Sequence, residues 1–386
     1  MKITAVICEL DPFHYGHEYL FRRVKEESDA VIAIMSGGFT ERGEAAMLSK
    51  YSRAGAALYG GADLVLELPF PFSMSGAEKF ALGGIDIARA IGCVDEIAFG
   101  SETGDAGEIN RAAARLCSTD FTRALAAKKG EAHSEPFGAL YFDTYRALYG
   151  DGGIFNGSND ILAVSYAKRL YETGSKIKIR AVRREGRSYS GEGEGFSSAS
   201  EIRRVVLSGG DYAPLVPAYS AREIASALAD GSISETERLY APLAAIYRVC
   251  DTSGFSSAYE TGDELYNRIK AAFADGCSFS EVVGKAAAKS YSPSKVRRAM
   301  IFAALGVTGW DVAKVTYTTV LGANKTGCEI LKSIKKTARI DVVTKPADYS
   351  SHAYGLAQKA EALVALARRS PAPAGEMMKM SPVIME

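Results

Sequence analysis

The sequence lacks the features of a membrane or secreted protein. No apolar run reaches 18 residues, so we predict no membrane-spanning helix. The chain begins directly with a short apolar segment and shows neither a basic leader nor a cleavage site, so we expect no signal peptide. Its six cysteines form no Cys-x-x-Cys pair, and no zinc motif is present. Scattered cysteines of this kind favour reduced thiols, and we therefore predict a cytoplasmic protein.

A net charge is also lacking, because 46 Lys and Arg residues balance 46 Asp and Glu residues. This balance argues against a nucleic-acid partner, since phosphates are bound by clustered cations. The charge is distributed unevenly, however: residues 285–345 contain twelve Lys and Arg but only three acidic residues. The asymmetry favours a functional basic patch, and the alternative is a solvated face with cations at helix C-termini.

What the sequence does contain is a strand-to-helix turn at its start. An apolar run at residues 3–8 is followed by the turn signal Asp11-Pro12 and by His14-Tyr15-Gly16-His17, after which the pattern becomes helical. Ligands bind at such a position in an open parallel sheet, and the helix N-terminus there favours a phosphate. The two histidines are therefore candidate catalytic residues. Their i, i+3 spacing would also suit half of a metal site.

Similar apolar runs of strand length recur along the first half of the chain. They lie at residues 30–35, 63–68, 94–99 and 177–182 and alternate with helical patterns. This alternation predicts a parallel α/β sheet. Beyond residue 212 the periodicity is helical, apart from a short strand pair near 315–320 and 340–344. We therefore predict a Rossmann-like parallel-sheet domain over residues 1–210, followed by a mainly helical, basic domain over residues 211–386.

The His-x-Gly-His turn resembles the nucleotidylyltransferase superfamily, and longer stretches narrow that resemblance to the bacterial tRNA(Met) cytidine acetate ligases. These stretches are CELDPFHYGH at 8–17, IMSGGFTERGEAA at 34–46, GADLVLELPF at 61–70, IAFGSE at 97–102, SNDILA at 158–163, SSASEIRR at 197–204, KSYSPSKVRRA at 289–299 and VLGANKTGCEILKSIKK at 320–336. The resemblance covers nearly the whole chain. It implies an ATP-binding nucleotidylyltransferase-like domain followed by a helical domain that binds tRNA.

The resemblance further implies an ATP-dependent ligase that modifies tRNA. ATP and acetate form acetyl-adenylate and pyrophosphate, and the N4 amine of the wobble cytidine in elongator tRNA(Met) then attacks the acyl carbon. His14 and His17 grip the ATP phosphates and steady charge on the α-phosphate, a task that needs positioned donors more than a base. We expect Mg²⁺ to be held through the ATP phosphates with few protein ligands. No carboxylate cluster of metal-site spacing is visible, so no residue is assigned to a metal.

The same resemblance assigns individual residues. The predicted ATP contacts are Ile7, Cys8, Glu9, Leu10, Asp11, Pro12, Phe13, His14, Gly16, His17, Leu20, Gly100, Asn159, Arg184, Ser198 and Arg203. The predicted tRNA contacts are Lys289, Lys295, Arg297, Arg298 and Lys325. Three ATP assignments have alternatives. Asn159 also fits a helix cap, Arg183 also fits the position given to Arg184, and Ser198 with Glu201 also forms a capping box.

Three positions depart from the family's usual pattern. Asp11 stands where the family has Asn, and it puts an anion near the phosphates unless Mg²⁺ or a lysine neutralises it. Ser190 stands where the family has His, and Thr319 replaces an Arg before Val-Leu-Gly. These departures bear on tRNA affinity and on the acyl substrate rather than on ATP binding.

Two other functions stay open on the sequence alone. One is an adenylyltransferase acting on a small phosphorylated metabolite, with the helical domain used for oligomerisation, for example as a homodimer. The other is a catalytically silent RNA-binding relative. The basic stretch in the second half of the chain favours the tRNA ligase over the metabolite enzyme, whereas the zero net charge favours neither.

Overall fold

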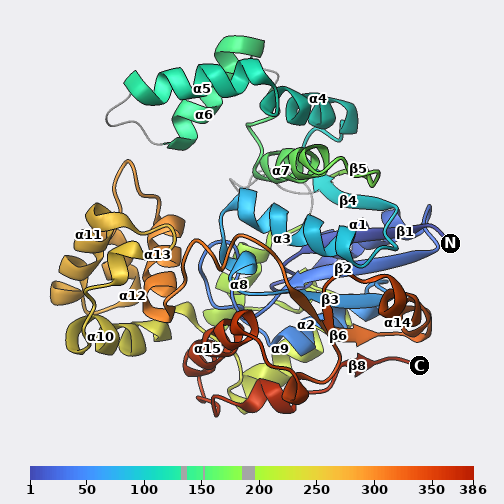
Figure 1. The fold of residues 1–386 in the computed structure, drawn as a ribbon. Coiled ribbons are helices and arrows are strands. Elements are labelled where there is room, and N and C mark those ends of the chain that lie inside the picture. The colour runs from blue at the N-terminus through green and yellow to red at the C-terminus, as the bar shows by residue number, and fades with distance from the viewer. Residues whose placement is uncertain (132–136, 151–152, 185–195) are drawn as a thin grey trace.

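The computed structural model describes residues 1–131, 137–150, 153–184 and 196–386. Its strands form one mixed sheet in the order β5-β4-β1-β2-β3-β6-β7, and β8 pairs with β6 (Figure 1). The strands are β1 Ile3–Cys8, β2 Ala30–Ser36, β3 Leu64–Leu68, β4 Glu96–Ser101, β5 Lys178–Arg183, β6 Tyr317–Ala323, β7 Asp341–Val343 and β8 Val383–Ile384. The α-helices are α1 Tyr15–Lys25, α2 Lys50–Tyr59, α3 Ala77–Ala90, α4 Ala106–Leu116, α5 Thr119–Glu131, α6 Phe137–Tyr149, α7 Ser158–Glu172, α8 Ala199–Leu207, α9 Ala218–Asp230, α10 Tyr240–Val249, α11 Gly262–Asp275, α12 Phe279–Ala286, α13 Pro293–Leu305, α14 Lys325–Thr337 and α15 His352–Leu366.

The first five strands pair in parallel. β1 lies between β2 and β4, and the pairs β2–β3 and β4–β5 extend the sheet on either side. β1 and β2 are apolar and buried almost throughout, as expected for strands covered on both faces. The Rossmann-like prediction is confirmed, and each of the five predicted strands lies within two residues of the observed one.

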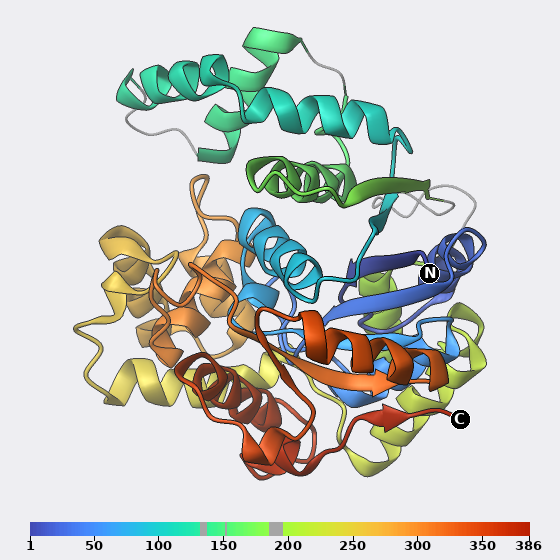
Figure 2. The same cartoon turned by 45° about the vertical axis from the view of Figure 1, so that its right-hand side comes forward.

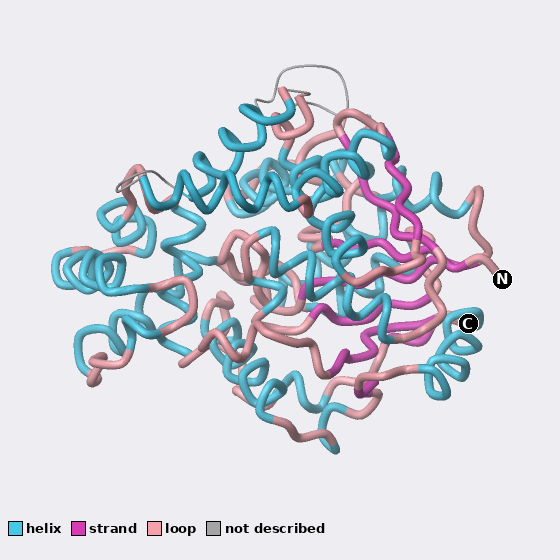
Figure 3. The backbone as a smooth tube through the Cα atoms, turned by 45° about the horizontal axis from the view of Figure 1, so that its top comes forward, coloured by secondary structure: helices cyan, strands magenta, loops and turns pink. Residues whose placement is uncertain are grey.

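Helices cover both faces of this sheet. Along β2, Ile32 and Ile34 face a core formed with α3, α4, α7 and α14. Val31 and Ala33 face the opposite core, which is formed with α1 and α2. This alternation follows from the two-residue period of a strand. Figure 3 shows the strands gathered at one end of the molecule, with helices extending away from them.

A third core lies among the later helices. It is formed by α10, α11, α12, α13 and α15 and includes Phe70 and Met74, which follow β3. The segment after β3 therefore anchors these helices beside the carboxyl edge of the sheet. None of the described helices is long and apolar enough to cross a membrane.

The expectation that the sheet ends with the fifth strand is wrong. The predicted strand pair near residues 315–344 exists, but β6 also pairs antiparallel with β3 (Figure 2). The Asn324 side chain donates to Asp63 Oδ1 at 3.0 Å, and a Cβ on Gly327 would lie 1.9 Å from the Asp63 carbonyl oxygen. Such close packing places the start of α14 directly against β3. The sheet thus crosses the boundary expected at residue 210, and that boundary stays a prediction.

Candidate active site

A cavity of about 450 Å³ lies at the carboxyl ends of β1 and β4. Its walls come from the segment after β1, the start of α1, the loop between β2 and α2, the end of β4, the first half of α7 and the segment before α8. These elements meet because parallel strands place their carboxyl ends at one edge of the sheet. The cavity therefore forms where the sequence predicts ligand binding.

His14 and His17 lie in this cavity at the start of α1. His14 is the N-cap, and its Nδ1 accepts a hydrogen bond from the Gly16 N–H at 3.0 Å. The His17 Nδ1 accepts from the His14 N–H at 3.3 Å, and the two rings stack with their centroids 3.8 Å apart. Because both Nδ1 atoms accept, each Nε2 carries the proton and is the atom that can donate to an anion.

Burial keeps both imidazoles neutral. It lowers the pKa of His14 to about 3, and the positive charges of Arg184 and Arg203 act in the same direction. Burial also lowers the pKa of His17 well below its ordinary value, as does the neighbouring His14. A phosphate would therefore meet two preorganised N–H donors rather than two cations, together with the unpaired N–H groups at the start of α1.

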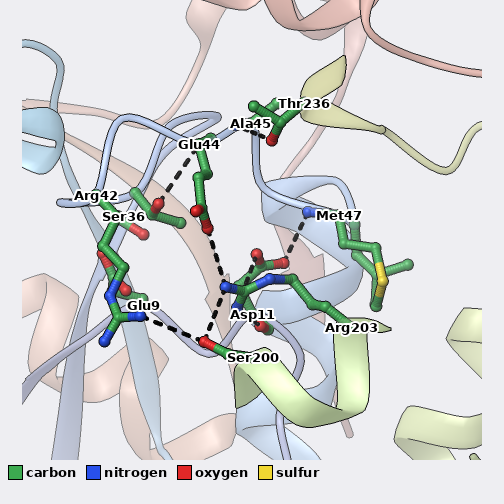
Figure 4. A network of polar contacts seen from close by, with 12 residues as sticks. Glu9, Asp11, Ser36, Arg42, Glu44, Ala45, Met47, Ser200, Arg203 and Thr236 are labelled. Atoms are coloured by element: carbon green, nitrogen blue, oxygen red, sulfur yellow. Dashed lines mark hydrogen bonds and ion pairs between the residues drawn. The ribbon is translucent and has the colours of Figure 1, made fainter. Parts of the chain in front are cut away.

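Asp11, which precedes the histidines, is buried and paired with an arginine. Its Oδ1 accepts from the Met47 N–H at 2.8 Å, and its Oδ2 lies 3.6 Å from Arg203 Nη1. Arg203 also donates to the Asp11 carbonyl oxygen at 2.7 Å and pairs with Glu44 at 3.0 Å (Figure 4). The counter-charge expected from Mg²⁺ or a lysine is thus supplied by Arg203, which lies on the other side of the motif.

The loop of residues 37–49, between β2 and α2, closes one wall of the cavity. The Glu41 N–H donates to Glu9 Oε1 at 2.6 Å, and Arg42 donates to the Ser200 hydroxyl at 3.4 Å (Figure 4). Burial raises the pKa of Glu9 to about 7, although the hydrogen bond from Glu41 opposes this shift. About half of the Glu9 carboxyls therefore carry a proton at pH 7, which reduces their repulsion of phosphate.

Gly100, Asn159 and Arg184 line another wall. A Cβ on Gly100 would lie 3.3 Å from Cγ of Arg184, so the glycine lets this arginine pack over the end of β4. Asn159 lies inside the first turn of α7, whose N-cap is Gly157, and its Nδ2 donates to Glu102 at 2.6 Å. The interpretation of Asn159 as a helix cap is therefore wrong, and its side chain belongs to the cavity wall.

Comparison with known proteins identifies the family. The model of the HIGH nucleotidyl transferases matches residues 1–376. The chain is 31% identical over 363 residues to the tRNA(Met) cytidine acetate ligase of Limosilactobacillus reuteri, and the match covers 89% of this chain and 90% of that protein. This chain belongs to the tRNA(Met) cytidine acetate ligase family. The resemblance inferred from the motifs is thereby confirmed.

Further similarities agree with this family. The protein of the same name from Clostridium perfringens strain SM101 is 32% identical over 367 residues, with 89% of this chain and 90% of that protein covered. A crystal structure of Thermotoga maritima TmcAL bound with alpha-thio ATP has a TM-score of 0.90 at 25% sequence identity, and the match covers 100% of this chain and 99% of that chain. The whole fold is therefore shared with a solved member of the family.

Most residues that the family implies for ATP lie together. All of them except Pro12, Phe13 and Ser198 line the cavity. Phe13 is fully buried in the core beside α1, and Ser198 caps α8 by accepting from the Glu201 N–H at 3.2 Å. The capping interpretation therefore describes the contact that Ser198 makes. The roles of these residues as ATP ligands stay predictions.

Several residues of the cavity wall were missed by sequence reasoning. They include Tyr19, Glu41, Arg42, Ala77, Phe80, Phe99, Tyr166 and Phe196. Glu41 and Arg42 belong to the IMSGGFTERGEAA stretch, so this motif offered a usable signal. Phe80 and Tyr166 occupy ordinary helical patterns that fit a protein core equally well, and nothing in the sequence distinguishes them.

Three of the predicted tRNA contacts reach the surface. Lys289 and Lys325 are exposed. Lys295 is half-buried, with its ammonium nitrogen 5.2 Å from the centroid of the Tyr291 ring. Lysines in these environments can contact a phosphate backbone without disturbing the core.

The other two predicted tRNA contacts turn inward. Arg297 donates to the Arg42 carbonyl oxygen at 2.8 Å, and Arg298 is 8% exposed. Arg298 pairs with Glu260 at 2.8 Å and with Glu41 at 3.4 Å. Both arginines therefore fasten α13 to the loop of residues 37–49, and their role toward tRNA stays a prediction.

The departure at Thr319 lies in the interior. Thr319 is 1% exposed in β6, and its hydroxyl has no partner among the described residues. It borders a small cavity shared with Lys50 and Glu361. The substitution therefore changes the packing behind the sheet rather than an exposed RNA-facing surface. Ser190 and the rest of the stretch 187–191 lie outside the described residues.

We predict that His14 makes the folded protein less stable in acid. Below about pH 6.5 the unfolded chain binds a proton at His14, whereas the folded protein does not until its pKa of about 3. The free energy of unfolding should therefore fall by up to about 1.4 kcal/mol per pH unit from this group as the pH drops below 6.5. His14→Asn should remove that part of the slope in denaturant titrations between pH 7 and pH 5. Parallel pH profiles of the variant and the wild type would contradict the assignment.

Proposed function

We propose that this protein is an ATP-dependent ligase that activates acetate as acetyl-adenylate and transfers the acetyl group to N4 of the wobble cytidine of elongator tRNA(Met). The observation that carries the proposal is the stacked, neutral His14–His17 pair at the helix start inside the cavity. The activity named for the relatives supports the acetate and tRNA parts. The basic stretch of residues 285–345 supports an RNA partner.

The first half-reaction suits these groups. A carboxylate oxygen of acetate attacks the α-phosphorus of ATP, a new O–P bond forms, and pyrophosphate leaves with the electrons of the broken bond. No proton needs to move in this step. The Nε2–H groups of His14 and His17 donate to phosphate oxygens whose charge grows in the transition state, and the start of α1 adds backbone donors.

The second half-reaction depends on holding two reactants together. The exocyclic amine of cytosine is a weak nucleophile, so the mixed anhydride supplies a good leaving group, and AMP departs as the new C–N bond forms. Binding the adenylate and the cytidine in one cavity makes this step effectively unimolecular. The amine loses one proton, which solvent or a cavity carboxylate accepts.

His17→Ala tests the adenylation site. The variant should lower acetate-dependent ATP–pyrophosphate exchange by about a hundredfold or more, the effect of removing a preorganised donor. Its melting temperature should stay close to that of the wild type because His17 is only half-buried. His352→Ala is the matched control, since this histidine is 79% exposed at the start of α15. Wild-type exchange in the His17 variant would overturn the proposed site.

Mg²⁺ is proposed to arrive with the ATP phosphates. Among the described residues, no group of three His, Cys, Asp or Glu side chains is placed to hold a metal ion. When bound, the ion would neutralise phosphate charge, as it does for ATP in other sites with few protein ligands. Exchange activity should therefore be lost in excess EDTA and restored by added Mg²⁺. Full activity with EDTA present would contradict this part of the proposal.

The exposed lysines are proposed to grip the tRNA backbone. A double variant with Lys289→Ala and Lys325→Ala should bind tRNA more weakly, and each lost phosphate contact should flatten the salt dependence by about one unit of slope. Acetyl-adenylate formation should be unchanged. Arg298→Ala is unsuitable for this test because Arg298 also holds Glu41 in the cavity wall.

Lys176→Ala combined with Lys359→Ala is the control for that experiment. Both lysines are exposed and lie outside the basic stretch of residues 285–345. Binding is measured as a salt series with elongator tRNA(Met), beside the exchange assay. If the two double variants give the same affinity and the same slope, the lysines at 289 and 325 belong only to a solvated face.

A further inference from the structure

The phenol of Tyr166 sits unpartnered at the wall of the cavity. Tyr166 is 1% exposed, and its hydroxyl has no hydrogen-bond partner among the described residues. Its ring packs against Phe99 with centroids 5.9 Å apart. A buried hydroxyl without a partner is costly, so its position beside an open cavity indicates a group that binds there.

Helix α7 relates this hydroxyl to the rest of the site. Asn159, Leu162 and Tyr166 follow the i, i+3, i+7 spacing, so they share one face of α7, and all three line the cavity. Seven residues span about 10 Å along a helix. Tyr166 therefore lies well away from the Asn159 end of the cavity wall, about two turns further along α7.

The start of α3 lies at the same level as Tyr166. Lys168 pairs with Glu78 at 2.5 Å, and Arg169 pairs with Asp86, so α3 and α7 run side by side in the same direction. Ala77, the first residue of α3, lines the cavity. The N-cap is Gly76, which offers no side-chain cap, so the first N–H groups of this 14-residue helix lack a side-chain acceptor.

The charges around this corner are balanced. Glu41 in the cavity wall is paired with Arg298, and Glu78 in the first turn of α3 is paired with Lys168. Burial raises the pKa of Tyr166 well above its ordinary value, and the nearby groups of Cys8, Glu9 and Glu41 act in the same direction. The phenol therefore stays protonated and can act only as a neutral donor toward an anion.

We propose that this corner is the subsite for the acyl donor, where the Tyr166 hydroxyl and the free N–H groups at the start of α3 bind the carboxylate of a short monocarboxylic acid. The inference rests on the proposed function, because it names the place of its acetate. A carboxylate at a helix N-terminus gains from the helix dipole, and a charge-assisted hydrogen bond from the phenol adds to it. The methyl group would pack against Phe80 and Phe99, whose rings leave little room for a longer chain.

This placement orients the first half-reaction. One carboxylate oxygen is held by the Tyr166 hydroxyl, and the other is left to attack the α-phosphorus of ATP gripped by His14 and His17. The O–P bond forms as the bond from the α-phosphorus to the bridging oxygen breaks, and pyrophosphate leaves. The hydroxyl keeps its proton throughout, so Tyr166 positions the substrate and takes no part in proton transfer.

Tyr166→Phe tests the subsite. Removing the hydroxyl should raise the KM for acetate in ATP–pyrophosphate exchange by about ten- to a hundredfold, the effect of one hydrogen bond to a charged group. The KM for ATP should not change, and the fold should not suffer because the hydroxyl has no protein partner among the described residues. Tyr171→Phe is the matched control on the same helix, since Tyr171 is 60% exposed.

A second variant, Ala77→Val, narrows the corner without touching the hydroxyl. It should also raise the KM for acetate while leaving the KM for ATP unchanged. If the wild type depends on acetate and both variants keep its KM for acetate, the subsite is wrong although the proposed function stands. A changed KM for ATP in Tyr166→Phe with an unchanged KM for acetate would assign the hydroxyl to the nucleotide instead. A wild type that needs no monocarboxylate at all would overturn the proposed function itself.

Discussion

The guanidinium of Arg53 fixes the wall on which the site is built. Arg53 is fully buried in α2 and donates to the carbonyl oxygens of Glu9, Gly37 and Leu48. These three carbonyls come from the segment after β1 and from both ends of the loop of residues 37–49. Their polar groups would be buried and unsatisfied without the arginine, at a cost of about 1–3 kcal/mol each. One side chain thus holds the histidine motif and the neighbouring loop in a single arrangement.

The loop of residues 37–49 also joins the cavity to the helices that follow the sheet. Its Glu41 pairs with Arg298 of α13, and its Gly38 N–H donates to Glu361 of α15 at 3.1 Å. Gly43 adopts a φ of 72°, and a Cβ there would lie 2.9 Å from the backbone nitrogen of Arg298. The helical half of the chain is therefore packed against the wall of the site. A tRNA bound to those helices would lie on elements that contact the adenylating cavity directly.

Local patterns predicted the first turn well because strand, turn and helix signals there lie within twenty residues. The same reasoning failed wherever the partner is distant in sequence. The apolar run of β6 announced a strand, but its pairing with β3 depends on packing around Asp63. Charge suggested exposed arginines at 297 and 298, whereas carbonyl and carboxylate partners more than 30 residues away bury them. Tyr166 carried no signal at all, because an unpartnered hydroxyl is visible only in three dimensions.

The aspartate at position 11 illustrates how a site absorbs a change of charge. Its contact with the Met47 N–H needs only an acceptor oxygen, which the asparagine usual in this family would also supply. The extra negative charge is offset by Arg203, whose Nη1 lies 3.6 Å from Oδ2. Phosphates then face a pair with no net charge rather than a free carboxylate. Because Arg203 is also paired with Glu44, less of its positive charge is left for the nucleotide. The neutral donors of His14 and His17 must therefore provide a larger share of the phosphate contacts in this protein.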